Sequence, residues 1–243
     1  MTLVRAELVK ARGTRSMWAL AGLAVLFSVA WAVVDVLVFL RSGGTVENAY
    51  GMAQQGYLFS LLLGIVLTAG EYRHQTITWT LLVTPRRGEV VRARFAACAV
   101  LGLAIGIAGV VVTAPVTAVL LAATGRTVFT PAVPGVLTGS ALSVALWCVF
   151  GGALGMLAKN QTVAVIGAFV WFLYGDGLLV AFVPSVGRWT PTGASRAVVG
   201  WDRGGREVAG DLLPGWAGVL LLLGYAAVAG FAARAISVRR DVT

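Results

Sequence analysis

Few residues in this chain are of types that could do chemistry: one histidine, two cysteines, and two aspartates inside long apolar runs. The single histidine, His74, has no second histidine at the spacing of a metal site, and no other histidine exists to act as the base for a serine nucleophile. Cys98 and Cys148 lie in apolar stretches, where cysteine usually behaves as a small hydrophobic residue. We therefore expect no metal site, no disulfide and no histidine-dependent catalysis.

The two aspartates, Asp35 and Asp176, are the candidate intramembrane functional acids, since ionisable residues inside a membrane usually mark function. Asp35 lies near the C-terminal end of its apolar run, so a position at the membrane interface is favoured over a functional role inside the membrane. Asp176 is flanked by Gly175 and Gly177, which fits a broken helix or a re-entrant bend as well as an interfacial acid. A catalytic pair would require both carboxyl groups close enough to share a proton, and the interfacial alternative makes this arrangement the less favoured one.

Nucleotide hydrolysis by the common route is excluded for this chain. It contains no G-x-x-x-x-G-K-[ST] sequence, and its only two lysines, Lys10 and Lys159, follow no glycine-rich turn. We therefore expect the chain itself not to be an enzyme and to carry no cofactor.

The elements that hold these residues are membrane helices. The 243 residues are 58% hydrophobic and only 12% charged, whereas soluble domains carry about 25% charged residues. The apolar residues fall in blocks of about 20 or more, the length that crosses a bilayer. The net charge of +9 does not indicate nucleic-acid binding, because the cations lie at the ends of these blocks and no groove-reading motif is present.

We predict an all-α integral membrane protein with a single transmembrane domain of six spans. Residues 1–16 form a basic segment, either an amphipathic helix in the headgroup layer or an unstructured tail. Residues 184–211 form a polar segment of short helices or re-entrant turns at the membrane surface. Gly102, Gly106 and Gly109 are spaced for close helix contact. The predicted spans are 17–40, 49–69, 95–122, 135–158, 162–183 and 212–236.

The positive charges predict the orientation. With both termini in the cytoplasm, the inner segments hold 13 of the 19 Lys and Arg residues and the outer segments hold the other 6. Segment 70–94 then becomes a cytoplasmic loop, and segment 184–211 lies outside the cytoplasm. The inner loop carries five arginines, which makes it the most basic loop of the chain.

Segment 70–94 carries a family resemblance. It contains Glu71-Tyr72-Arg73-His74-Gln75-Thr76 and, after it, Leu81-Leu82-Val83-Thr84-Pro85-Arg86-Arg87-Gly88. This sequence resembles the cytoplasmic segment of bacterial ABC-2-type transporter permeases, in which G-E-[YF]-R-x-G-T precedes L-x-T-P-x-R-R. Gly70 supplies the first glycine, and Gln75 stands where the family usually has a second one.

The resemblance implies a permease of the type V exporter-like fold in a bacterial cytoplasmic membrane. Two permease copies, or one copy and a homologous partner, would form a dimer. A coupling helix in segment 70–94 would fit a groove on a separate ATP-binding subunit, which would use ATP and Mg²⁺. Arg86 and Arg87 could pair with acidic groups there, or could contact lipid phosphates and only set the orientation. The implied contact residues are Glu71, Tyr72, Arg73, His74, Thr76, Leu81, Leu82, Pro85, Arg86, Arg87 and Gly88.

Two functions follow as expectations. The first is ATP-driven transport, with export of an amphipathic or lipid-like compound, a drug or a peptide weakly favoured by the apolar spans. The alternative is a non-transporting membrane anchor or sensor that recruits a soluble partner through segment 70–94.

Overall fold

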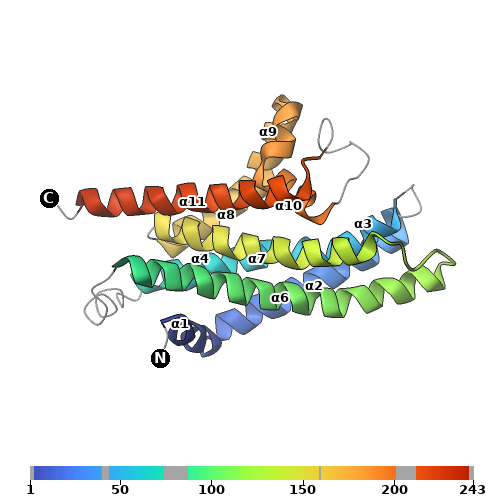
Figure 1. Ribbon diagram of the computed structural model, residues 1–243, viewed down its shortest axis with the longest axis horizontal. Helices are drawn as coiled ribbons and strands as arrows, with labels where there is room; N and C mark the ends of the chain where they lie inside the picture. Colours follow the sequence, from blue (N-terminus) through green and yellow to red (C-terminus); the bar gives the residue numbers. More distant parts are fainter. Residues whose placement is uncertain (1–2, 40–43, 74–86, 159, 201–211, 241–243) are drawn as a thin grey trace.

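The computed structural model describes residues 3–39, 44–73, 87–158, 160–200 and 212–240. Within these ranges the chain is helical and contains no strand (Figure 1). The elements are α1 Leu3–Arg12, α2 Arg15–Val34, η1 Asp35–Phe39, α3 Val46–Gly51, η3 Met52–Gly56, α4 Tyr57–Arg73, α6 Arg87–Ala123, α7 Val133–Ala158, α8 Gln161–Val170, η4 Trp171–Gly175, α9 Asp176–Phe182, η5 Pro184–Trp189, α10 Pro191–Val199 and α11 Gly215–Arg240.

Five helices in the described ranges are long and apolar enough to cross a membrane, which confirms an all-α, multi-pass membrane protein. The second begins three residues earlier than predicted, because α3 and η3 lead without a break into α4. The third is also longer than predicted, because α6 runs unbroken for 37 residues and includes Pro115. The five helices are Arg15–Val38, Val46–Gly70, Gly88–Ala123, Val133–Ala158 and Gly215–Ala233.

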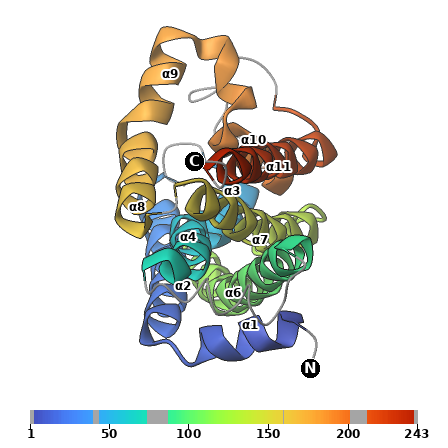
Figure 2. The same cartoon turned by 90° about the vertical axis from the view of Figure 1, so that its left-hand side faces the viewer.

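The span predicted at 162–183 is not one of these five helices. It is divided into α8, the π-helical turn η4 and α9. At the break, the ring of Trp171 lies against Gly175, where a Cβ atom would come within 2.7 Å of it. Figure 2 shows α8 and α9 forming an arc that leaves the bundle and returns at α10 beside α11. Because α7 ends where α11 also ends, this arc carries the chain back along the bundle (Figure 1).

The N-terminal segment forms the helix α1 rather than an unstructured tail, and its location in the headgroup layer stays a prediction. Figure 2 shows α1 lying crosswise to the bundle, with the long helices seen end-on. Val4 and Leu8 are partly buried and Ala11 is buried, as their spacing on one helix face predicts. Helix α1, the end of α4, the start of α6 and the C-terminal end of α11 all lie at one end of the bundle (Figure 1). We call residues 74–88, which lead in the sequence from α4 into the start of α6, the connector.

Small residues bring α7 close to both of its neighbours α4 and α6. A methyl group on Gly151 would collide with the backbone carbonyl of Leu61 in α4. On the other side, Cβ atoms on Gly102 and Gly106 would come within 2.6 Å and 2.5 Å of α7 atoms, so the close contact predicted for these glycines is confirmed. Gly109 meets only an ordinary contact, at 3.5 Å from a carbonyl oxygen of η3. Glycine allows the backbones to approach where any larger side chain would separate them.

The segment before the last span contains short helices, as predicted for its described part. Thr190 caps the start of α10, because its hydroxyl accepts a hydrogen bond from the Gly193 amide, and Gly200, which has a left-handed backbone, caps its end. Most of its side chains are buried against α7 and α11. Helix α10 is therefore packed into the protein rather than lying on its surface.

Candidate functional site

The segment that carries the sequence motif is described only at its two edges. Glu71, Tyr72 and Arg73 form the end of α4, and Arg87 and Gly88 form the start of α6. The helices thus extend into the predicted loop from both sides. The remaining predicted contact residues, His74, Thr76, Leu81, Leu82, Pro85 and Arg86, lie outside the described residues.

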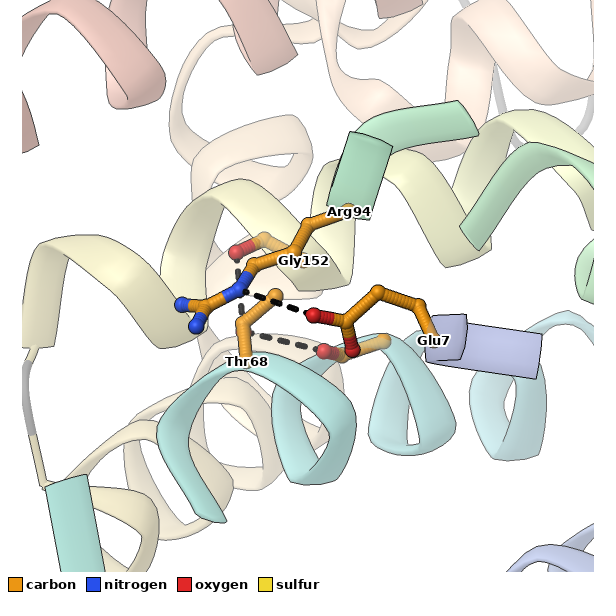
Figure 3. A network of polar contacts seen from close by, with 5 residues as sticks. Glu7, Thr68, Arg94 and Gly152 are labelled. Atoms are coloured by element: carbon orange, nitrogen blue, oxygen red, sulfur yellow. Dashed lines mark hydrogen bonds and ion pairs between the residues drawn. The ribbon is translucent and has the colours of Figure 1, made fainter. Parts of the chain in front are cut away.

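Two helical turns into α6, an ion pair joins this helix to the crosswise helix α1. Arg94 is 6% exposed, and its Nε atom lies 3.7 Å from Oε1 of Glu7 (Figure 3). A buried guanidinium is costly without a nearby carboxylate, so Glu7 stabilises the charge at this position. The ion pair therefore attaches α1 to the first turns of α6, which follow the connector.

Lys10 adds a second cation beside the same carboxylate. Burial lowers the pKa of Lys10, the charge of Glu7 raises it, and the charge of Arg94 lowers it again. Glu7 is therefore shared by cations from both helices, which explains why an acid occurs in an N-terminal segment that is otherwise basic. Sequence reasoning assigned these cations to membrane orientation and did not foresee the pair.

Behind this pair, α4 and α7 are held together by a buried hydroxyl. The Thr68 hydroxyl lies 3.0 Å from the carbonyl oxygens of Gly152 in α7 and of Gly64 in its own helix, and can donate to either (Figure 3). A Cβ atom on Gly152 would lie 3.0 Å from Sγ of Cys98 in α6. The contacts among α1, α4, α6 and α7 thus lie close together, at the end of the bundle next to the connector. Such an arrangement can transmit a displacement between these helices.

The two candidate acids lie in different parts of the fold. Asp35 is 2% exposed and begins η1, which packs on α2, α3 and α6. Asp176 begins α9 and accepts a hydrogen bond from the Thr192 hydroxyl of the α10 region. Helix α9 packs on η4 and η5, so the elements that hold the two acids have different main neighbours. Asp35 is enclosed by protein rather than exposed at an interface.

A buried polar network near the middle of the bundle was not anticipated from the sequence. The Trp147 indole N–H donates to Oγ of Ser195 at 3.0 Å, and this hydroxyl donates to Oε1 of Gln54 at 3.0 Å. Ser143 joins them, with its Oγ 2.6 Å from that of Ser195. The network links η3, α7 and α10. Gln54 inside an apolar run was the only visible signal, because its partners lie far away in the sequence.

A cavity of about 480 Å³ lies between α7 and α11 on one side and α8, η4, α9 and η5 on the other. Its wall is almost entirely apolar and includes Phe150, Trp171, Phe172, Trp189 and Tyr225. Cavities of this volume accommodate small organic molecules. The sequence could not predict it, because the break in the helix at η4 creates the space.

The described residues contain no cluster of three or more His, Cys, Asp or Glu side chains that could hold a metal ion. No protein-family model matches the chain, and no match is found among curated proteins. The resemblance to ABC-2-type permeases therefore rests on the sequence motif in residues 70–88 and on its position between the second and third predicted spans.

Proposed function

We propose that this chain is the transmembrane permease subunit of an ABC-2-type ATP-binding cassette transporter in a bacterial cytoplasmic membrane. The observation that carries the proposal is the position of the motif. The two helix ends that flank it, the end of α4 and the start of α6, lie at the end of the bundle where α1 crosses and α11 ends. A soluble ATPase that contacts this end would reach the motif, α1 and the C-terminal end together.

The full proposed architecture has six crossings and both termini in the cytoplasm. The arc through α8, η4 and α9 supplies the crossing that the five long helices lack, because the start of α2 and the end of α11 lie at the same end of the bundle. A second copy of the chain, or a homologous permease, would complete the transporter. ATP and Mg²⁺ would bind only to the partner ATPase.

Coupling would be mechanical. Helix α6 is unbroken over 37 residues, about 55 Å at 1.5 Å per residue, so a push on the connector at its start would reach its other end. The pair between Glu7 and Arg94 would carry α1 along, and the close contacts of α7 with α4 and α6 would make these helices move as one unit. Movement of this unit relative to the irregular α8–α9 arc would open and close the substrate path across the membrane.

Charge reversal in the connector tests the coupling. In vesicles that contain the chain and the ATPase subunit with which it copurifies, Arg86→Glu combined with Arg87→Glu should abolish stimulation of ATP hydrolysis, because acidic groups on the ATPase would be repelled. Arg126→Glu is the control, since this exposed arginine follows α6 at its other end. Membrane insertion of all variants is checked by their yield in the membrane fraction.

The results separate the proposed functions. Unchanged stimulation in the double variant would refute the role of the two arginines. A soluble partner that binds through the connector, with no ATP-dependent movement of any solute, would favour the membrane anchor or sensor.

A further inference from the structure

The cavity between α7, α11 and the α8–α9 arc has an aromatic wall. Trp171 and Phe172 come from η4, Trp189 from η5 and Tyr225 from α11, so the rings approach from different sides of the space. The Tyr225 hydroxyl donates to the backbone carbonyl of Trp189 at 2.6 Å, which fixes two of these walls to one another. Faces of Trp and Tyr rings attract cations.

A carboxylate lies beside this wall. Asp176 and Leu179 are three residues apart on α9 and share one helix face, and Leu179 lines the cavity. One oxygen of Asp176, Oδ2, accepts a hydrogen bond from Thr192, whose hydroxyl lies 3.0 Å from that of Thr190 in the cavity wall. Asp176 also lies within electrostatic range of the Tyr225 hydroxyl. The carboxylate is thus linked to the cavity wall through Thr192 and Thr190.

The other oxygen of Asp176, Oδ1, is buried and makes no hydrogen bond. Within the described ranges, Asp176 forms no ion pair with an arginine or lysine. Arg188 in η5 lies over Trp189, with its guanidinium 5.6 Å from the ring centroid; like Asp176, it does not line the cavity. A buried carboxylate without a cation is unfavourable, so a positive ligand at this position would be stabilised.

We propose that this cavity binds a hydrophobic organic monocation, with its apolar body among the aromatic rings and its charge toward Thr190, which Thr192 links to the carboxylate of Asp176. The volume suits a molecule of drug size, and the wall offers aromatic rings to its apolar body. The carboxylate of Asp176 does not line the cavity and would attract the positive charge through space. The site would define the cargo class of the proposed transporter, and it depends on that proposal for transport. Binding itself requires only this chain.

Tetraphenylphosphonium is a suitable probe, because tetraphenylborate has nearly the same shape and the opposite charge. Calorimetric titration of the purified chain in a neutral detergent should give saturable binding of the cation and much weaker binding of the anion. Asp176→Asn keeps the size of the side chain and an oxygen for Thr192. It should weaken binding of the cation by about tenfold or more and leave binding of the anion unchanged or stronger.

Asp35→Asn is the matched control, because it removes a second buried carboxylate that lies away from the cavity. It should leave the affinity for both ions unchanged. Elution of each variant as a single peak in gel filtration, together with its binding of the anion, shows whether it is folded. If the variant at position 176 does not fold, Trp171→Ala provides the second test and should weaken binding of the cation more than binding of the anion.

Equal binding of the two ions by the unchanged protein, or an equal effect of the variants at positions 35 and 176, would overturn the proposal and leave an apolar cavity for neutral or lipid-like molecules. The assay contains no ATPase. Failure to find an ATPase partner would therefore refute the proposed transporter and not the binding site, whereas loss of the charge preference would refute only the site.

Discussion

Replacing Gly151 with alanine should push α4 away from α7. The added methyl group would overlap the backbone carbonyl of Leu61, which is fully buried and cannot move without its helix. Overpacking of this kind costs about 1–3 kcal/mol. Alanine is also a better helix former than glycine, by about 0.5–1 kcal/mol. We therefore expect a net loss of stability of about 1–2 kcal/mol.

The control is Gly22→Ala in α2, because a methyl group there meets nothing within 4 Å. Unfolding of both variants in detergent is followed by intrinsic tryptophan fluorescence on heating. A loss of 1 kcal/mol lowers Tm by roughly 2–4 °C in a chain of this size, so the Gly151 variant should unfold several degrees below the control. Equal Tm values would refute the backbone contact between α4 and α7, and with it the argument that these helices move together.

Two further predictions concern the polar contacts. Glu7→Gln removes the charge that faces Arg94 and should lower the stability of the fold by about 1–3 kcal/mol, between the values for surface and fully buried ion pairs. Amide hydrogen exchange in α1 should become about tenfold faster, and an unchanged exchange rate would contradict the ion pair. Ser195→Ala leaves the buried indole N–H of Trp147 without its acceptor and should cost about 1–3 kcal/mol. Ser143→Ala should cost less, because that indole keeps Ser195, and an equal loss of thermal stability in both variants would argue against this network.

Composition and periodicity were sufficient to predict the helical membrane architecture. Apolar blocks of bilayer length predicted the five long helices, because a helix satisfies its backbone hydrogen bonds within one continuous segment inside a membrane. The spacing of Val4, Leu8 and Ala11 predicted the buried face of α1. These features depend on residues that are close in the sequence, so local patterns are enough to find them.

The features that the sequence did not predict depend on contacts between distant residues. The arc at 161–182 has the apolar composition of a span, and its break depends on how Trp171 packs over Gly175. The carboxylate of Glu7 is 87 positions away from Arg94, and no pattern in either segment relates them. The glycines beside Asp176 did indicate an irregular helix there, but the cavity next to it follows only from the fold.

The most direct test of the central claim is to purify the tagged chain from its own membranes in mild detergent and identify the proteins that remain bound. The account predicts a stoichiometric ATP-binding subunit with ATPase activity, which the double charge reversal at Arg86 and Arg87 releases. A chain that purifies alone and stable, with no ATP-binding protein attached, would contradict the proposal that it is a transporter subunit.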